Sequence, residues 1–367
     1  MSGAVEVLRL PEDRGRWLAL LARLPGHDVY QRPEYLGLFD ERLAPGVADA
    51  FRGRPLAFVL EDDAGLALHP LLERSLEGIA CLEGEATHWR DLVSPYGYAG
   101  PVLAVDRPGD AAALAARFAA RCGERCREEG IVTEFIRFHP LLGNAAHADW
   151  GTPDRRGDVV VVDLRQDDAG LLAAMSDTTR SLVRAAPRRG IEVVAGEADG
   201  PATLGRLYSE TMSRRGAAPE YFFPDGFFAA MVAGLGDRSA LFVAREGTRA
   251  VAAAIFLACG SHASYAFAGT DVHAPASAGR AIVHEALRWA RDRGCGTMLL
   301  GGGVGAGADG LFRFKRSFSR SLLPFHTAGR IHMPDAYRAL ADRRRRQFEA
   351  CGGDTRRGPG YFPEYRR

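Results

Sequence analysis

The stretch that decides our prediction of the fold lies near the C-terminal end and reads Gly301-Gly302-Gly303-Val304-Gly305-Ala306-Gly307-Ala308-Asp309-Gly310-Leu311-Phe312-Arg313-Phe314-Lys315-Arg316-Ser317-Phe318. It follows a short apolar run, 297–300, which is typical of a strand, so we expect a strand that leads into a glycine-rich loop. Lys315 is the only lysine of a chain in which Lys and Arg together number 47. An ammonium group is a compact charge that can give up its proton, whereas a guanidinium group is planar and stays charged. We therefore predict a functional role for Lys315; the alternative is a residual lysine left by chance.

The composition is that of a globular protein, with 47% hydrophobic and 25% charged residues. No run of about 18 apolar residues occurs, which argues against a membrane-spanning helix. The first residues lack the basic and apolar regions of a signal peptide. The six cysteines are scattered, and they do not form the paired spacing of a zinc site. We expect a cytoplasmic protein with reduced thiols and no bound metal ion.

The charge is distributed unevenly along the chain, although the formal net charge is only +1. Residues 313–367 contain 14 basic and five acidic side chains, so the rest of the chain is acidic. A basic segment attached to an acidic body indicates an anionic partner near the C-terminal end. The alternative is a solvated helix, because the four arginines 343–346 could simply face water.

A similar order of elements occurs twice in the chain. In the first half, a helix predicted over 110–129 leads into a strand over 131–138. In the second half, a helix predicted over 280–293 leads into the strand over 297–300. The turn-rich segment 151–158 separates the two halves. This order predicts an α+β fold in which one helix crosses between strands in each half.

Two familiar motifs are matched only in part. The segment 305–310 has the spacing G-x-G-x-x-G, but a dinucleotide site needs a helix directly after it, and 311–314 is a poor start for a helix. His284 and Glu285 begin a zinc-protease motif, but position 288 is Arg where the second His belongs. We expect neither a dinucleotide site nor a zinc site here.

The segment 276–281 lies where acetyl-CoA enzymes of the GNAT class cradle a pyrophosphate on free amides at the start of a helix. Its candidate cofactor-binding residues are Ala278, Gly279 and Arg280. The segment lacks the Gln or Arg that opens the GNAT motif, and the corresponding loop of the first half, 107–110, is one residue short. We therefore expect no tightly bound cofactor, and CoA binding only if the chain is an acyl-CoA enzyme.

The segment 311–318 resembles the "FK-x-x-F" motif of the Fem family of aminoacyl-tRNA-dependent transferases. Further segments resemble motifs of that family, namely the basic helix 178–190, the helix 208–215 and the loop 96–101. The resemblance implies two tandem GNAT-like domains, each with a mixed central sheet flanked by helices. We place them at 1–155 and 156–331, with 332–367 packing back on the first domain. The long heptad pattern of a coiled-coil arm, present in some members, does not occur.

The resemblance implies a cytoplasmic enzyme that moves an amino acid from the 3′ end of a charged tRNA to an amine, forming an amide bond. The acceptor is then a small anionic or peptide-like molecule, either a peptidoglycan precursor or a natural-product peptide, and we expect a monomer. A second hypothesis is an acyl-CoA-dependent GNAT N- or O-acyltransferase acting on a sugar or another small molecule. A third is a GNAT-like binding protein without catalytic activity, in which Lys315 would be dispensable.

By the same resemblance, Lys315 stabilises the oxyanion of the transfer reaction. Phe314 would fix the loop and lend its backbone carbonyl to the attacking amine. No Ser-His-Asp or Cys-His set is evident in the sequence, so we expect direct transfer without an acyl-enzyme.

The residues predicted to bind substrate fall into two groups. Arg214 and Arg215 would bind a phosphate or carboxylate of the acceptor, for which a guanidinium fork is suited, or they form an exposed helix end. The cleft for the acceptor would be lined by Tyr96, Tyr98, Thr211 and Tyr265, for each of which core packing is the alternative. A third set, Arg137 and His139 beside Asn144, is predicted to orient the loop that carries Tyr96. Asn144 is the only asparagine in the chain.

Overall fold

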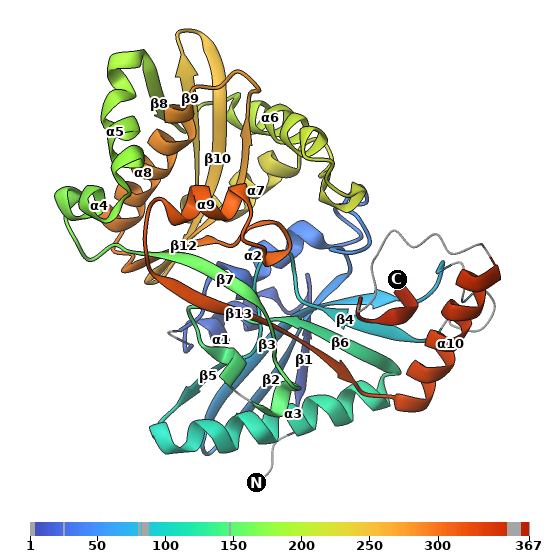
Figure 1. Ribbon diagram of the computed structural model, residues 1–367. Helices are drawn as coiled ribbons and strands as arrows, with labels where there is room; N and C mark the ends of the chain where they lie inside the picture. The colour runs from blue at the N-terminus through green and yellow to red at the C-terminus, as the bar shows by residue number, and fades with distance from the viewer. Residues whose placement is uncertain are drawn as a thin grey trace.

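The computed structural model describes residues 4–24, 26–79, 82, 88–146, 148–350 and 361–366. The described strands form one continuous sheet of 13 strands, in the order β1-β2-β3-β4-β6-β13-β7-β12-β11-β10-β9-β8, with β5 paired to β3. The two halves of the chain form two lobes, which β7 and β13 join (Figure 1). None of the described helices combines the length and the hydropathy that a membrane span requires.

The first half contains a mixed, mainly antiparallel sheet with a long helix packed against it. Its strands are β1 (Glu6–Arg9), β2 (Arg54–Asp62), β3 (Gly65–Ser75), β4 (Arg90–Val93), β5 (Val102–Val105) and β6 (Ile131–Arg137). Its helices are α1 (Arg14–Leu21), α2 (Pro33–Leu36) and α3 (Ala111–Glu128). Helix α3 buries Leu114, Phe118 and Cys122, which are four residues apart and so lie on one face. The predicted helix and the strand that follows it are confirmed.

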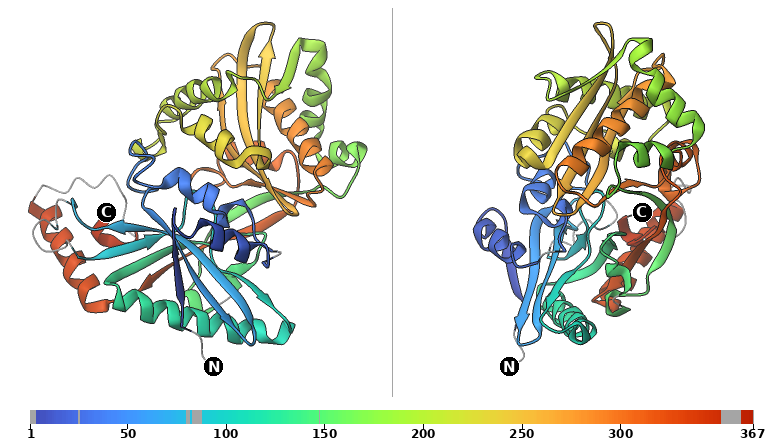
Figure 2. Two further views of the ribbon diagram at one scale, coloured as in Figure 1. Left: turned by 180° about the vertical axis from the view of Figure 1, so that it is seen from behind. Right: turned by 90° about the vertical axis from the view of Figure 1, so that its left-hand side faces the viewer.

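The second half is a meander with helices on both faces. Its strands are β8 (Ile191–Ala195), β9 (Ser239–Glu246), β10 (Arg249–Cys259), β11 (His262–Thr270) and β12 (Thr297–Gly301). Its helices are α4 (Asp168–Ala174), α5 (Asp177–Ala185), α6 (Gly200–Arg214), α7 (Phe227–Leu235), α8 (Ala276–Asp292) and α9 (Gly310–Arg316). Helices α5 and α8 pack together on one face, and α6 and α7 cover the other (Figures 1 and 2).

Each half contains one parallel pair of strands, β4 with β6 and β11 with β12, and a helix precedes the second strand of each pair. The next strand then crosses to the other half. Strand β7 (Asp154–Asp163) follows β6 in sequence but pairs with β12. Strand β13 (Leu322–Ile331) follows the second half, and it pairs with β7 and then with β6. The halves are therefore joined by exchanged strands rather than by a simple linker.

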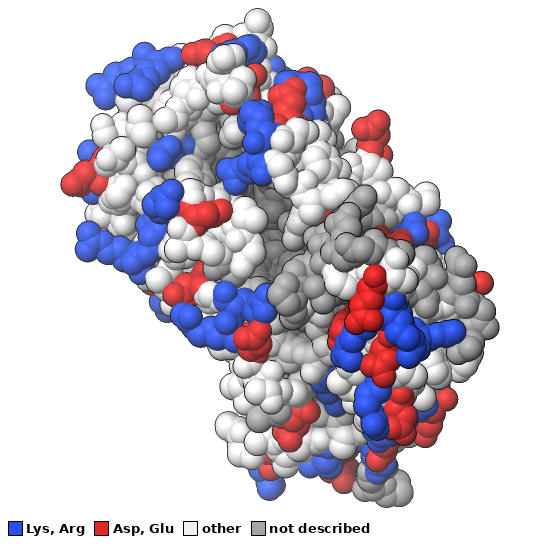
Figure 3. Space-filling view, turned by 45° about the vertical axis from the view of Figure 1, so that its right-hand side comes forward, with Lys and Arg blue, Asp and Glu red and all other residues white. Residues whose placement is uncertain are grey.

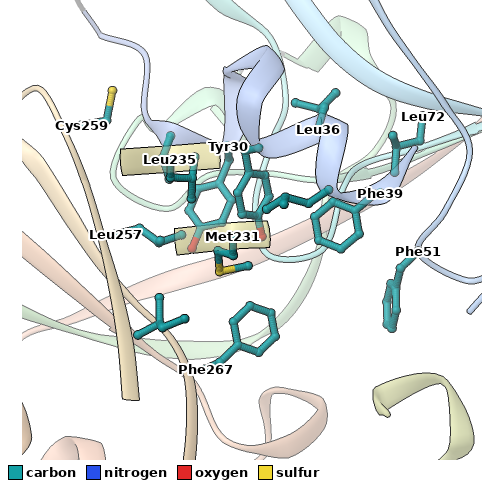
Figure 4. Packing of buried hydrophobic residues seen from close by; sticks show 14 of the residues in the cluster. Tyr30, Leu36, Phe39, Phe51, Leu72, Met231, Leu235, Leu257, Cys259 and Phe267 are labelled. Carbon is teal, nitrogen blue, oxygen red and sulfur yellow. The ribbon is translucent and has the colours of Figure 1, made fainter. Parts of the chain in front are cut away.

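The two halves also share one hydrophobic core. Buried side chains of the N-terminal helices and strands pack in one cluster with side chains of α6, α7, β10 and β11. Figure 4 shows Tyr30 and Phe39 of the first half close to Met231, Leu235 and Phe267 of the second. Burying so much apolar surface between the halves favours a single, fixed arrangement of the two.

The C-terminal residues return to the first half. Helix α10 (Pro334–Ala350) and Tyr365 pack in a cluster with Leu76 and Val132. The hydroxyl of Tyr365 lies 2.6 Å from the Thr133 hydroxyl. The basic segment contributes ion pairs to this contact, of Arg330 with Glu134, Arg345 with Glu364 and Arg366 with Asp91. Figure 3 shows basic and acidic side chains alternating over this part of the surface. Several of these arginines are therefore partnered by the protein itself, so the segment does not present its whole formal excess of positive charge to a ligand.

Candidate active site

The glycine-rich stretch folds into a loop followed by a short helix, α9. The prediction that 311–314 would not open a helix is wrong, because Asp309 caps α9. The Asp309 carboxylate accepts hydrogen bonds from the backbone amides of Phe312 at 2.8 Å and of Val304 at 3.1 Å. Side chains are also excluded from the loop, since a Cβ atom at Gly303 would lie 2.1 Å from the carbonyl oxygen of Gly307. The Asp309 carboxylate therefore occupies the start of α9, the position at which a helix would otherwise bind a phosphate.

Lys315 lies on α9 and is 9% exposed. Its ammonium group donates one hydrogen bond, to the carbonyl oxygen of Gly302 at 2.8 Å, and lies 5.5 Å from the centre of the Tyr265 ring. A Cβ atom at Gly301 would lie 3.1 Å from the lysine nitrogen and 3.3 Å from the Tyr98 hydroxyl oxygen. The two groups therefore lie next to a position that has no side chain. Gly301 has a φ of +83°, which glycine adopts without strain.

The surroundings of Lys315 lower its pKa to about 7, chiefly because burial disfavours the charged form. The nearby carboxylate of Asp309 opposes this shift, and the charge of Arg215 adds to it. At neutral pH the group therefore exists in both the charged and the neutral form. An arginine at this position would stay charged, so the two side chains are not equivalent here.

A β-bulge directs Tyr265 toward Lys315. Strand β10 pairs Ile255 with Phe267 but Phe256 with Tyr265, so β11 has one extra residue between them. The extra residue reverses the alternation of side chains. Tyr265 consequently stacks on Phe256, with ring centres 5.0 Å apart, while Phe267 points into the core that both halves share.

The loop between β4 and β5 supplies two tyrosines to the junction of the halves. Tyr98 lies edge-on to Tyr30 and Phe325, each at 5.5 Å between ring centres. Tyr96 stacks on Phe267 of the second half at 5.1 Å. Burial raises the pKa of both tyrosines, so both keep their protons and can donate hydrogen bonds. The structure thus brings Tyr98 and Tyr265 to Lys315, and places Tyr96 on the other side of the loop.

The two arginines that were predicted to bind the acceptor, Arg214 and Arg215, have different surroundings in the structure. Thr211 is buried, and its hydroxyl donates to the Leu207 carbonyl at 2.7 Å and accepts from the Thr270 amide at 2.9 Å. Arg214 donates to Thr211 and to the carbonyl of Thr270. Thr211 and Arg214 therefore connect α6 to β11 through hydrogen bonds to Thr270. Arg214 and Arg215 are both exposed, but Arg215 belongs to none of the ion pairs of the described residues and contributes to the electrostatic field at Lys315.

The predicted cofactor residues lie in the first turns of α8, where Gly279 and Arg280 are half-buried beside Phe314. Ala278 is fully buried in the core of the second half. A Cβ atom at Gly279 would lie 3.9 Å from the Phe314 ring, and the Arg280 guanidinium lies 5.4 Å from the centre of that ring. Arg280 also donates to the Thr179 hydroxyl at 3.2 Å.

The expectation that the Phe314 carbonyl would receive the attacking amine is corrected by the structure. This oxygen accepts from the Ser317 hydroxyl at 2.6 Å and from the Ser317 amide at 3.2 Å, so both of its acceptor positions are used. Sequence reasoning also missed Asp309, although an Asp just before a glycine and an apolar run is the pattern of a helix N-cap. Tyr30 was missed because no local pattern shows its contact with Tyr98.

Comparison with known proteins agrees with this fold. Residues 173–316 match the family model described as an acetyltransferase (GNAT) domain, and this range includes Lys315. The crystal structure of FemX is similar with a TM-score of 0.63 and 14% identity, over 88% of this chain and 96% of that one. L-PGS from Bacillus licheniformis gives a TM-score of 0.52 and 15% identity, over 87% and 91%. A conserved protein of unknown function from Bacteroides thetaiotaomicron VPI-5482 gives 0.53 and 11%, over 89% and 99%.

A search of curated proteins found no match. The chain has a GNAT-like fold with tandem domains, in which mixed sheets are flanked by helices. The family model supports an acyltransferase, and the residues that carry Lys315 and α8 belong to the matched domain.

Proposed function

We propose that this protein transfers an amino acid from a charged tRNA to an amine acceptor and forms an amide bond. The observation that carries the proposal is the buried ammonium group of Lys315, which makes one hydrogen bond within the protein and lies beside Tyr98 and Tyr265. A cation held in this way suits a reaction in which negative charge develops on a single oxygen.

In the proposed reaction, the amine nitrogen attacks the ester carbonyl of the aminoacyl group. A C–N bond forms, the C–O bond to the ribose breaks, and the proton lost by the amine is taken up by the departing ribose oxygen. The carbonyl oxygen is negative in the tetrahedral intermediate, and Lys315 is the group that stabilises it. Such a preorganised donor contributes about 3–4 kcal/mol to the lowering of the barrier.

Two further observations support a tRNA-linked donor over acyl-CoA. The start of α8, where a GNAT enzyme would bind the CoA pyrophosphate, lacks the Gln or Arg that opens the GNAT motif, and the Phe314 ring packs beside its Gly279. The segment that resembles the Fem motif contains Lys315, and FemX is among the structures with a similar fold. The exposed Arg215, near Lys315, is suited to a phosphate or a carboxylate of the acceptor, which we take to be a peptidoglycan precursor or a small natural-product peptide.

The second candidate is an acyl-CoA-dependent N- or O-acyltransferase acting on a sugar or another small molecule. The observation in its favour is the match of residues 173–316 to an acetyltransferase model. A ligand that binds only the folded protein stabilises it by an amount that grows with the logarithm of ligand concentration above the Kd, so the melting temperature should rise with acetyl-CoA concentration. On our first proposal, acetyl-CoA leaves the melting temperature unchanged.

The donor is identified by a transfer assay with two labelled pools. Wild-type protein is incubated with radiolabelled aminoacyl-tRNAs or with radiolabelled acyl-CoA, each in the presence of UDP-linked peptidoglycan precursors and short peptides with free amines. We expect label from aminoacyl-tRNA in a product that resists ribonuclease and alkaline ester hydrolysis, and none with Lys315→Met. Label arriving only from acyl-CoA, or equal transfer by Lys315→Met, contradicts the proposal.

A further inference from the structure

Arg137, the last residue of β6, is a half-buried cation without a carboxylate partner. Its guanidinium donates one side-chain hydrogen bond, to the carbonyl oxygen of Ser94 at 3.3 Å. None of the ion pairs among the described residues includes Arg137. Apart from tyrosines, the ionisable group with the largest effect on its pKa is Arg74, which is also a cation. Burial lowers the pKa of Arg137 accordingly. Nearby Arg74 shows the usual solution, because it is buried against Asp91 at 2.8 Å.

Aromatic rings from separate segments surround the Arg137 guanidinium. It lies 5.1 Å from the centre of the Phe135 ring and 5.9 Å from that of Phe51. Phe51 in turn contacts Tyr96 at 5.0 Å and Tyr221 at 5.7 Å between ring centres. Tyr221 comes from the segment after α6 and is 38% exposed, so the group of rings reaches the surface on that side. We call Phe51, Tyr96, Arg137 and Tyr221 the Arg137 site.

Ring contacts compensate a buried guanidinium only in part, since a cation–π contact is weaker than a charge-assisted hydrogen bond to an anion. The guanidinium has five N–H donors, and the hydrogen bonds among the described residues use one of them, for the Ser94 carbonyl. A planar donor group of this kind binds a phosphate or a carboxylate with two parallel hydrogen bonds. The rings beside it are suited to an aromatic or apolar group attached to that anion.

We propose that the Arg137 site binds an organic anion, a phosphate or carboxylate joined to an aromatic or apolar group. Tyr96 of this site and Tyr98 beside Lys315 are two residues apart on one loop. A molecule bound at Arg137 therefore lies within reach of the transfer site across that loop. We assign the anion to the acceptor, and this last step rests on the proposed function.

The binding step can be tested without any donor by titration calorimetry. The probes are phenyl phosphate, benzoate, inorganic phosphate and benzyl alcohol, so that the two kinds of anion, the anion alone and the ring alone are compared. We expect an aryl anion to bind at least ten times more tightly than inorganic phosphate or benzyl alcohol. Arg137→Gln should weaken that binding by a factor of ten or more, while the exposed, matched variant Arg206→Gln leaves it unchanged.

Tyr221→Ala provides a second variant at an exposed position, in case Arg137→Gln does not fold. It should weaken phenyl phosphate binding several-fold and leave inorganic phosphate binding unaffected. The inference is overturned if wild-type protein binds neither aryl anion, or if both variants bind them as tightly as wild type. Lys315→Met should bind normally. If no transfer is detected but the binding losses occur, the proposed function fails and the Arg137 site stands.

Discussion

Strand β6 of the first half and strand β12 of the second end in corresponding places, and a residue type that occurs once in the chain lies just beyond each. Beyond β6, Asn144 is buried, and its side-chain amide makes hydrogen bonds to the protein through both its nitrogen and its oxygen. Its amide donates to the carbonyls of Ala99 at 2.9 Å and Pro101 at 3.1 Å, and its oxygen accepts from the His139 amide at 2.9 Å. Beyond β12, Lys315 is buried with one hydrogen bond, to Gly302.

The difference between the two ends separates structure from chemistry. A buried amide with every donor and acceptor paired stabilises the fold and has nothing left to offer a substrate. A buried ammonium with unused donors costs free energy in the folded protein and is retained for another reason. Rarity in the sequence draws attention to both residues equally, and only the hydrogen-bond partners tell them apart.

The comparison predicts its largest effect for Lys315. Lys315→Met should lower the rate of transfer by a factor of about 100 to 1000, because the oxyanion loses its cation. Lys315→Arg should also fall well below wild type, since the larger planar group cannot occupy the space beside Gly301 in the same way. The measurement is the initial rate at saturating donor. A rate for Lys315→Arg close to that of wild type would show that any cation suffices.

Asn144→Ala should act on stability instead. Removing this side chain leaves the buried carbonyls of Ala99 and Pro101 without donors, which costs roughly 2–4 kcal/mol in the free energy of unfolding. Urea denaturation measures the loss, and because Ala99 and Pro101 belong to the loop that carries Tyr98, transfer per folded molecule should fall, but far less than in Lys315→Met. Asn144→Asp is the matched control, because it keeps the acceptor for the His139 amide and removes both donors. Asn144→Asp should therefore lose at least as much stability, and a stability close to wild type in either variant would remove the structural role.

The pH dependence of stability provides a further test of Lys315. Replacing Lys315 should stabilise the folded protein, whereas replacing Asn144 should destabilise it. The pKa of Lys315 is lowered from 10.5 to about 7 on folding, so between these values the unfolded chain binds more protons than the folded one. Wild-type stability therefore rises with pH across this range relative to Lys315→Met, which lacks the group. Below pH 7 we expect Lys315→Met to be more stable than wild type by about 5 kcal/mol, because the pKa falls from 10.5 to about 7 and each pH unit corresponds to about 1.4 kcal/mol. The advantage should shrink toward pH 10. Parallel curves for the two proteins would contradict the burial of a titrating ammonium.

Much of the fold follows from local sequence patterns. The helix over 177–185 begins after Ser176, whose hydroxyl accepts from the Thr179 amide, and a left-handed Gly190 follows it with a φ of +70°. Caps and periodicity act within a few residues, so they are visible in the sequence. The same patterns placed Lys315 and Tyr265 in the second half, but gave no account of how Tyr98 of the first half comes to lie beside them.

What the sequence could not show depends on long-range pairing. Strands β7 and β13 read as ordinary strands, and nothing in their residues says that each one pairs across the two halves. For the basic C-terminal segment the sequence left an anionic partner and a solvated helix open, and neither hypothesis included the pairing of Arg330 with Glu134 and of Arg366 with Asp91 of the first half. Net charge along a chain does not say which charges will be paired once it folds.

The smallest predicted effect concerns Asp309. This residue contributes to stability because it caps α9, and it affects the charge of Lys315 because it lies near that side chain. Asp309→Ala removes the acceptor for the Phe312 and Val304 amides, and should cost about 1 kcal/mol of stability. Asp309→Asn keeps a capping oxygen but removes the charge that opposes the lowering of the Lys315 pKa. It keeps the acceptor for only one of the two amides, so it should retain part of the stability, while the pH at which Lys315 loses its proton moves below about 7. If transfer needs the charged ammonium, the rate of Asp309→Asn should decline at a lower pH than that of wild type. Identical pH–rate profiles for the two proteins would separate the titration of Lys315 from catalysis, and the lysine would then have to act through position rather than charge.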